Sequence, residues 1–265
     1  MPRTGPTADA AAAHSACIRR LTPERDERVR LYCFPFAGGT AASYRPLAKV
    51  LPEHVGLVAF QPPGRQDRLG EPPVTDLRSL VPEFATALLA DLDDRNSRAY
   101  GLFGHSMGTI LAYEVALELK RLGVEPPRLL TVSGRRAPHL PPEPGFQPYH
   151  LMSDDEFLTR VMSLGGIPPE LAAYPDLLEL VLPTLKADFA AVETYEWRPV
   201  AELDCPIAVF GGLDDLDSPP ASLDPWAGLS TARTRVRTYP GGHFFLWDHA
   251  QDMFAHVAAG LSPAA

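Results

Sequence analysis

The stretch most suited to chemistry is 104–108, which reads Gly-His-Ser-Met-Gly and therefore holds a Gly-x-Ser-x-Gly pattern. An apolar, strand-like segment precedes it and a helix-like segment follows it. This context is typical of a nucleophile elbow, a sharp strand-to-helix turn that exposes one serine hydroxyl. Glycine suits the positions two before and two after the serine, because side chains there would collide with the neighbouring strand and helix. We predict that Ser106 is the attacking group of an acyl-transfer enzyme.

A serine of this kind needs a base, because its hydroxyl is a weak nucleophile near neutral pH. In elbow-type enzymes the base is a histidine that comes last in the chain, after an aspartate or glutamate. His243 follows Gly241 and Gly242 at the end of a strand-like segment, and a helical pattern starts behind it. None of the other histidines has this context, so we predict His243 as the base.

Three aspartates compete for the role of the acid that orients the base. Asp214, Asp215 and Asp217 all follow the apolar run 206–210, at the sheet edge where open α/β sheets bind ligands. Asp215 completes a Gly-x-x-Asp pattern from Gly212, and we choose it. Asp214 completes the same pattern one residue earlier and is the nearest alternative.

The transition state of acyl transfer carries negative charge on oxygen, which two backbone N–H groups must stabilise. One should come from Met107, directly after the nucleophile. The other should come from the turn 34–39, Phe-Pro-Phe-Ala-Gly-Gly, because its glycines let the backbone approach a substrate. We place the second donor at Ala37, with Phe36 as the alternative.

Composition describes one acidic globular protein with a sizeable core. The 265 residues are 45% hydrophobic and carry a net charge of −9, which argues against a nucleic-acid or anionic-membrane binder. The three cysteines are too few and too far apart to indicate disulfides or zinc. No metal cluster and no nucleotide-binding glycine motif is evident, so we expect no cofactor. The pattern shows no signal peptide and no membrane span, so we expect a cytoplasmic protein. A monomer is the default expectation for its oligomeric state.

The elements that must position these residues alternate between short apolar runs and longer amphipathic ones. That alternation predicts an α/β fold with a mostly parallel sheet flanked by helices. The expected strands are 17–21, 29–36, 55–61, 99–104, 128–133, 206–210 and 233–239, and the expected helices are 44–51, 77–92, 107–122 and 245–259.

The alternation breaks between 137 and 200, where the pattern shows helices at 154–164 and 169–195 but no strand. We expect this segment to be a helical lid inserted over the active-site edge of the sheet. The sequence then divides into a disordered tail at 1–16, a core formed by 17–136 and 201–262, and the lid.

Several motifs together resemble the type II thioesterases, stand-alone α/β-hydrolases that accompany polyketide synthases and nonribosomal peptide synthetases. They are 34–39 (Phe-Pro-Phe-Ala-Gly-Gly), 63–65 (Pro-Gly-Arg), 103–108 (Phe-Gly-His-Ser-Met-Gly) and 241–245 (Gly-Gly-His-Phe-Phe), supported by 133–138, 187–189 and 193–195. The resemblance extends from about Arg19 to Leu261.

This resemblance implies an editing enzyme, which hydrolyses aberrant or stalled acyl groups from the phosphopantetheine arm of carrier proteins. It implies Ser106, Asp215 and His243 as the triad and Ala37 and Met107 as the oxyanion donors. The partners are then acyl or peptidyl carrier domains, and the phosphopantetheine belongs to the substrate. A carboxylesterase or lipase with the same triad, acyl transfer to a bound alcohol or amine, and a non-catalytic carrier-binding module remain the alternatives. Four arginines, Arg65, Arg68, Arg135 and Arg136, are equally compatible with carrier contact and with burial.

Overall fold

The computed structural model describes residues 17–23, 27–93, 99–143, 145–167 and 174–262. The proposed tail at 1–16 therefore lies outside the described residues. Seven strands form a single sheet in the order β1-β3-β2-β4-β5-β6-β7. The strands are β1 (Ile18–Arg20), β2 (Val29–Phe34), β3 (Val55–Phe60), β4 (Tyr100–His105), β5 (Leu129–Ser133), β6 (Ile207–Gly212) and β7 (Thr234–Tyr239).

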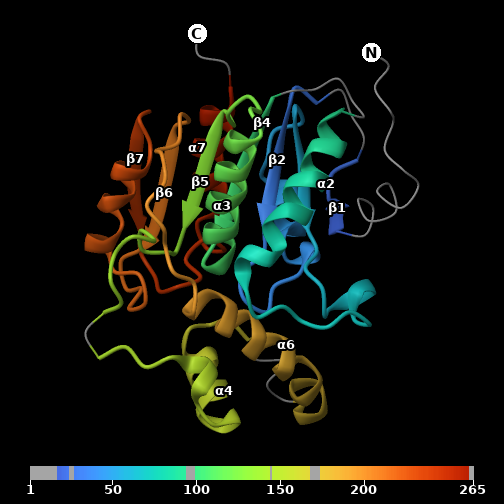
Figure 1. Ribbon diagram of the computed structural model, residues 1–265, viewed down its shortest axis with the longest axis vertical. Helices are drawn as coiled ribbons and strands as arrows, with labels where there is room; N and C mark the ends of the chain where they lie inside the picture. Colours follow the sequence, from blue (N-terminus) through green and yellow to red (C-terminus); the bar gives the residue numbers. More distant parts are fainter. Residues whose placement is uncertain (1–16, 24–26, 94–98, 144, 168–173, 263–265) are drawn as a thin grey trace.

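Parallel pairing joins all neighbouring strands except β1, which runs antiparallel to β3. Strands β2 to β5 are fully buried along their length, as expected for parallel strands covered on both faces. Their carboxyl ends point to the same edge of the sheet, at the bottom of Figure 1.

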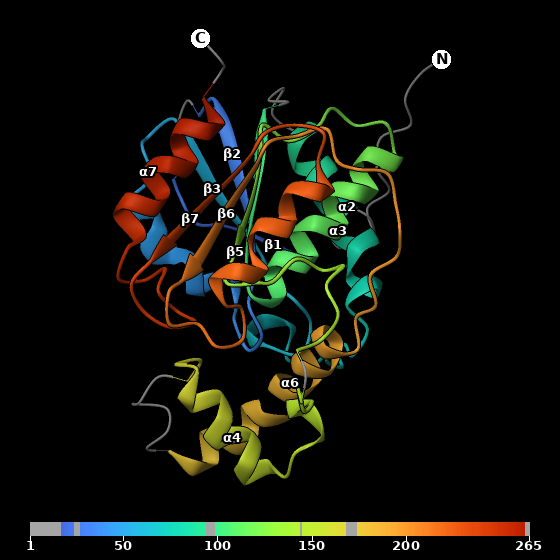
Figure 2. The same ribbon diagram turned by 90° about the vertical axis from the view of Figure 1, so that its left-hand side faces the viewer.

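Helices cover both faces of the sheet (Figures 1 and 2). On one face α2 (Val81–Asp93) and α3 (Met107–Arg121) pack over a large apolar cluster, and on the other α7 (Ala250–Leu261) and the 3-10 helix η1 (Ala41–Lys49) enclose a second one. The shorter 3-10 helices are η2 (Gln66–Arg68), η3 (Leu77–Leu80), η4 (Tyr149–Leu151), η5 (Pro220–Ser222) and η6 (Asp224–Leu229). None of the described helices is long and apolar enough to cross a membrane.

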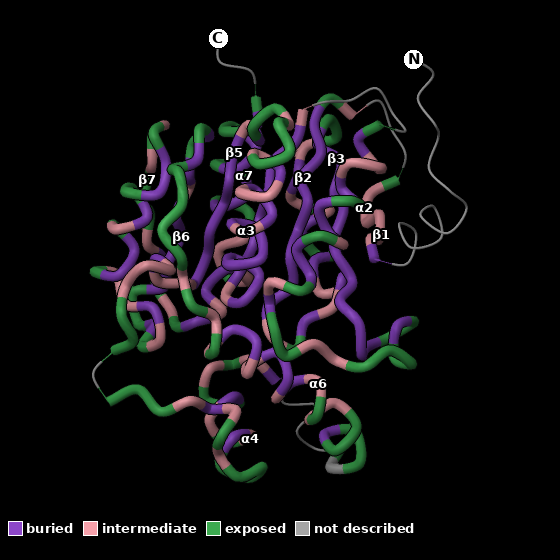
Figure 3. The backbone as a smooth tube through the Cα atoms, in the orientation of Figure 1, coloured by how far each residue is buried: buried purple, intermediate pink, exposed green. Residues whose placement is uncertain are grey.

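The segment between β5 and β6 lies beyond the carboxyl ends of the strands (Figures 1 and 2). It contains η4, α4 (Asp154–Ser163) and α6 (Pro175–Glu193), and its described residues form no strand. An apolar cluster of its own holds these helices together: Tyr149, Phe157, Val161, Ile167, Leu178 and Leu185. The outer side of α4 is exposed, in contrast to the buried sheet (Figure 3). We call this segment the lid, and its boundaries at 137 and 200 stay a prediction.

The sequence places every strand within two residues of its observed ends, but the predicted helices differ more. The expected helix at 77–92 is η3 followed by α2, and the expected helix at 169–195 is α6, with 169–173 outside the described residues. Two other predicted helices are wrong in kind or extent. The expected helix at 44–51 is η1, a 3-10 helix that begins at Ala41 and contains Pro46. Proline has no N–H for an α-helical hydrogen bond and its ring collides with the preceding turn, so a regular α-helix is disfavoured there. The last helix begins at Ala250 rather than at Phe245, because the preceding residues form turns behind the His243 loop.

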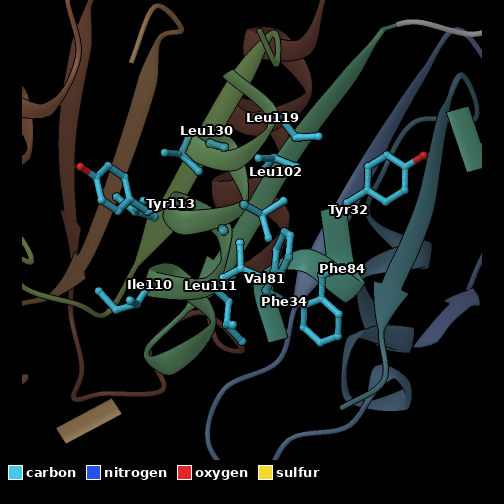
Figure 4. Packing of buried hydrophobic residues seen from close by; sticks show 14 of the residues in the cluster. Tyr32, Phe34, Val81, Phe84, Leu102, Ile110, Leu111, Tyr113, Leu119 and Leu130 are labelled. Atoms are coloured by element: carbon cyan, nitrogen blue, oxygen red, sulfur yellow. The ribbon is translucent and has the colours of Figure 1, made fainter. Parts of the chain in front are cut away.

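The core between the sheet and α3 is a tight mixture of aromatic and aliphatic side chains (Figure 4). Leu119 points into it and is 1% exposed, whereas Leu122, at the carboxyl end of the same helix, is 48% exposed. Leu119 lies within α3 and Leu122 follows its last residue as the C-cap, so the two leucines are near neighbours in the sequence that differ mainly in burial.

We expect Leu119→Ala to lower the free energy of unfolding by about 2–5 kcal/mol, because it leaves a cavity in a close-packed interior. Leu122→Ala should change it by less than about 0.5 kcal/mol. Urea denaturation of both variants measures the difference. Equal losses would contradict this assignment of the core.

Candidate active site

Ser106 occupies the single residue between β4 and α3, where the chain turns sharply from strand to helix. Its backbone angles are φ 54° and ψ −118°, a region that non-glycine residues rarely adopt. Its own N–H donates to the carbonyl of Ser133 on β5 over 2.8 Å, which ties the turn to the neighbouring strand. The structure thus presents the serine on a strained elbow, as the sequence pattern predicts.

The two flanking glycines are required by close backbone contacts. A Cβ at Gly104 would lie 2.0 Å from the carbonyl oxygen of Gly108, and a Cβ at Gly108 would lie 2.0 Å from that of Phe34. Backbone atoms cannot give way as a flexible side chain can. Any larger residue at either position would therefore push α3 away from β4 or from β2.

Asp215 and His243 come together although 28 residues separate them. The Nδ1 atom of His243 lies 2.8 Å from Oδ2 of Asp215, and the two side chains are 8% and 0% exposed. The other carboxylate oxygen of Asp215 accepts hydrogen bonds from the backbone N–H groups of Asp217 (3.0 Å) and Ser218 (3.3 Å). The carboxylate is fixed by its own loop, and it in turn fixes the orientation of the imidazole.

The two rival aspartates have other partners. Asp214 is exposed and accepts a hydrogen bond from the N–H of Gly241. Asp217 accepts the hydroxyl of Tyr149 over 2.8 Å and lies 3.2 Å from the guanidinium of Arg160, both in the lid. Of the three acids, Asp215 is the one that bonds His243.

His243 also lies beside the elbow. Its ring centroid is 5.1 Å from that of His105, the residue directly before Ser106. The loop that carries it packs closely on the end of β6, where a Cβ at Gly212 would meet the carbonyl oxygen of Gly242 at 2.4 Å. The three predicted residues therefore stand on loops at one edge of the sheet.

The turn after β2 supplies the other predicted oxyanion donor. Phe34 on β2 pairs with Gly104 on β4, so the residues that follow each strand emerge side by side. The N–H of Gly39 donates to the carbonyl of Phe36 over 2.8 Å and closes a turn with Ala37 and Gly38 at its centre. Gly38 has φ 75°, as the third residue of a type II turn requires. Among the described residues, neither the Ala37 N–H nor the Met107 N–H donates a hydrogen bond.

Of the four arginines left open by the sequence, two are buried and paired, whereas Arg135 and Arg136 are half-buried. Arg65 and Arg68 are buried and form ion pairs with acidic side chains, Arg65 with Asp188 of α6 and Arg68 with Glu71 and Glu83. These two are part of the structure rather than of a docking surface. The three cysteines are free and buried. Within the described residues, no group of histidine, cysteine or acidic side chains is arranged to hold a metal ion.

His105 is a site residue that the sequence did not single out. It is fully buried, its Nδ1 lies 3.0 Å from the hydroxyl of Ser133, and its Nε2 has no hydrogen-bond partner among the described residues. Burial, together with the nearby His243, holds the pKa of His105 well below its ordinary 6.5. A neutral imidazole therefore lies behind the elbow. The only hint in the sequence was its place in the apolar run of β4.

Comparisons with known proteins identify the family. The family model of the thioesterase domain matches residues 29–261. The chain belongs to the thioesterase family. The thioesterase PikA5 of Streptomyces venezuelae is 38% identical over 245 residues, which cover 92% of this chain and 85% of PikA5.

Two solved thioesterases share the fold. The type II thioesterase BorB of the borrelidin cluster has a TM-score of 0.81 and 34% sequence identity, over 93% of this chain and 98% of BorB. The thioesterase RedJ of the prodiginine pathway in Streptomyces coelicolor has a TM-score of 0.81 and 35% identity, over 98% of this chain and 96% of RedJ. This thioesterase accordingly has the α/β-hydrolase fold, and it is a serine hydrolase that cleaves thioesters.

The depressed pKa of His105 makes stability depend on pH. Below about pH 6.5 the unfolded chain takes up a proton at this residue, whereas the folded protein does not. Protons then favour the unfolded state, and this part of the stability is lost as the pH falls below 6.5. We expect His105→Asn, which cannot titrate, to reduce the loss between pH 6.5 and 5 by up to about 1.4 kcal/mol per pH unit.

Urea denaturation across this pH range measures the slope. His256→Asn, which removes an exposed histidine of α7, is the control for the substitution itself. If the two variants and the unmodified protein give the same slope, His105 does not carry this dependence.

Proposed function

We propose that Ser106, His243 and Asp215 act as the catalytic triad of an editing thioesterase. The observation that carries this proposal is the hydrogen bond between His243 and Asp215 beside the strained elbow of Ser106. Since Nδ1 of His243 donates to the carboxylate, the lone pair of Nε2 is available as a base. The burial of both groups excludes water from their contact.

The first half of the reaction forms an acyl-enzyme. His243 takes the proton of Ser106 as the hydroxyl oxygen attacks the thioester carbonyl. The N–H groups of Ala37 and Met107 hold the resulting oxyanion. The carbon–sulfur bond then breaks, and the imidazolium protonates the leaving thiolate. A thiolate is a good leaving group, so this proton matters less than it would for an amide.

The second half releases the acid. His243 takes a proton from water, which attacks the acyl-enzyme carbonyl, and the same two N–H groups hold the second oxyanion. Collapse of this intermediate breaks the serine ester, and the imidazolium returns a proton to Ser106. Asp215 stays a carboxylate throughout and stabilises the imidazolium in both halves.

We propose acyl chains on the phosphopantetheine arm of carrier proteins as the substrate, removed when they are aberrant or stalled. Supporting this are the relatives, named as thioesterases of the borrelidin and prodiginine pathways, and the apolar lid beside the sheet edge. No cofactor is needed, because serine, histidine and backbone amides supply the chemistry. Acyl or peptidyl carrier domains of a synthase are then the partners. The cytoplasmic location and the monomeric state stay predictions from the sequence.

Loss of the nucleophile tests the mechanism. Ser106→Ala should lower kcat for an acyl-carrier thioester on the order of a millionfold, because the acyl-enzyme can no longer form. Release of free acid from a panel of acyl-carrier proteins, varied in chain length and α-branching, measures the rate. Labelling by a fluorophosphonate should disappear in the same variant.

Matched substrates separate the alternatives. The same acyl group should be hydrolysed faster from a carrier thioester than from an oxygen ester. The reverse order would indicate a carboxylesterase, and formation of a new ester or amide would indicate acyl transfer. An unmodified protein that binds carriers but neither hydrolyses them nor reacts with the fluorophosphonate would be a binding module.

Substitution of the aspartates tests which of them acts as the acid. Asp215→Asn should lower kcat roughly 10³–10⁴-fold, because an amide neither stabilises the imidazolium nor keeps the tautomer. Asp214→Asn is the matched control, one residue away and exposed, and should stay within about threefold of the unmodified protein. Steady-state hydrolysis by the two variants decides between them. A larger loss in Asp214→Asn would transfer the role to Asp214.

A further inference from the structure

A carboxylate of the lid reaches the turn that carries Ala37. Asp188, on α6, is 4% exposed, and its Oδ2 accepts a hydrogen bond of 2.7 Å from the N–H of Gly38. Gly38 directly follows Ala37, so Asp188 holds one end of the peptide next to the proposed oxyanion donor. This contact bridges 150 residues of sequence.

The same carboxylate is held by a buried arginine. The guanidinium of Arg65 donates to both oxygens of Asp188, at 2.6 and 2.7 Å. Arg65 also donates to the carbonyl of Gly39 over 3.0 Å, on the other side of the turn, and to that of Pro63 over 3.2 Å. The pair therefore forms hydrogen bonds to the turn at two points, the N–H of Gly38 and the C=O of Gly39.

Two further contacts of α6 reinforce this junction. The side chain of Leu185 covers Gly38 so closely that a Cβ there would meet its Cδ1 at 2.6 Å. The hydroxyl of Thr184 donates to the carbonyl of Gly64 over 3.0 Å. One helical turn of the lid thus touches both the turn after β2 and the loop after β3.

The conformation of the turn gives this contact a chemical consequence. A turn closed by Phe36 and Gly39 can place its central peptide in either of two orientations, which differ by a rotation of about 180°. The N–H of that peptide belongs to Gly38. A carboxylate that accepts this N–H selects one orientation, the one with a positive φ at Gly38.

Stability alone explains such a pair poorly. A buried ion pair must overcome the loss of hydration of both charges, and its replacement by apolar residues of similar size is often neutral or stabilising. Two of the three backbone bonds that this pair makes go to one turn, the turn that carries the proposed oxyanion donor.

We propose that Asp188, held by Arg65, is a positioning residue that fixes the Ala37–Gly38 peptide and so keeps the Ala37 N–H aimed at the oxyanion. The inference rests on the proposed function. Through Asp188 the lid helix α6 contributes to the geometry of the oxyanion hole as well as covering the site.

The test replaces the pair without leaving a buried charge. Arg65→Met combined with Asp188→Leu keeps the volume and removes the acceptor of the Gly38 N–H. We expect a folded protein whose kcat for an acyl thioester is about 10- to 100-fold lower, since a displaced donor costs about that much. KM should stay within about threefold. Affinity for an alkylboronic acid, which forms a tetrahedral adduct with an active-site serine, should fall in parallel with kcat.

Asp188→Asn is the second variant, in case the double variant does not fold. Its amide cannot accept from Gly38 and both arginine nitrogens at once, and we expect the same changes in the same direction. Glu193→Gln is the matched control. Glu193 lies on the same helix with a side chain 6% exposed, and it accepts from the N–H groups of Tyr149 and His150, within the lid. That variant should have a lower Tm and an unchanged kcat.

The outcomes are distinct. Folded pair variants with normal kcat and normal boronate affinity would overturn the positioning role, as would a change confined to KM. A loss of kcat in Glu193→Gln as large as in Asp188→Asn would mean that any weakening of the lid has this effect, and would also overturn it. If the unmodified protein hydrolyses no thioester, the proposed function itself fails, before any variant is compared.

Discussion

Parallel pairing of β2, β4, β5 and β6 is the constraint on which the site depends. Parallel neighbours end at the same edge of the sheet, so the loops that follow them must meet there. This arrangement brings together the turn that contains Ala37, the elbow at Ser106 and the loop that carries Asp215. The loop after β7 joins them because β7 is also parallel to β6. No local preference of these loops could bring such distant residues together.

The elbow shows how the fold sustains a strained residue. A serine at positive φ costs on the order of 1–3 kcal/mol, and it persists only where its surroundings allow no relaxed alternative. Here β4 is buried among strands on both sides and α3 packs on the large core cluster. The close backbone contacts at Gly104 and Gly108 restrict the conformation of the three residues between them. Packing of the core thus fixes the backbone that carries the proposed nucleophile, Ser106.

The lid is attached to the core by polar contacts at its two ends. Near its start, Tyr149 and Arg160 bind Asp217, two residues after the proposed acid Asp215. Near its end, Asp188 binds Arg65 and the turn of Ala37. Between these points the lid holds its own apolar cluster. Two of the loops that it touches, those after β2 and β6, lie at the candidate site, which couples the cover of the site to its shape.

The strand pattern, the fold class and the elbow could be predicted from the sequence alone, because each depends on local features. Apolar runs of strand length, amphipathic helices and glycines around a serine follow from periodicity and steric limits within a few residues. It also indicated a helical insertion, since strand patterns stop between 137 and 200. Proline in η1 and the turns before α7 displaced the predicted helices, because local backbone chemistry there competed with the apolar pattern.

Only the tertiary structure decided which side chains meet. Three aspartates were open to the same role in the sequence, and the bond to His243 distinguishes Asp215 by its place in a folded loop. The partner of Arg65 lies 123 residues away, and the burial of His105 results from packing by several segments. Contacts of this length depend on how strands and helices are arranged around one core, which no short stretch of sequence specifies.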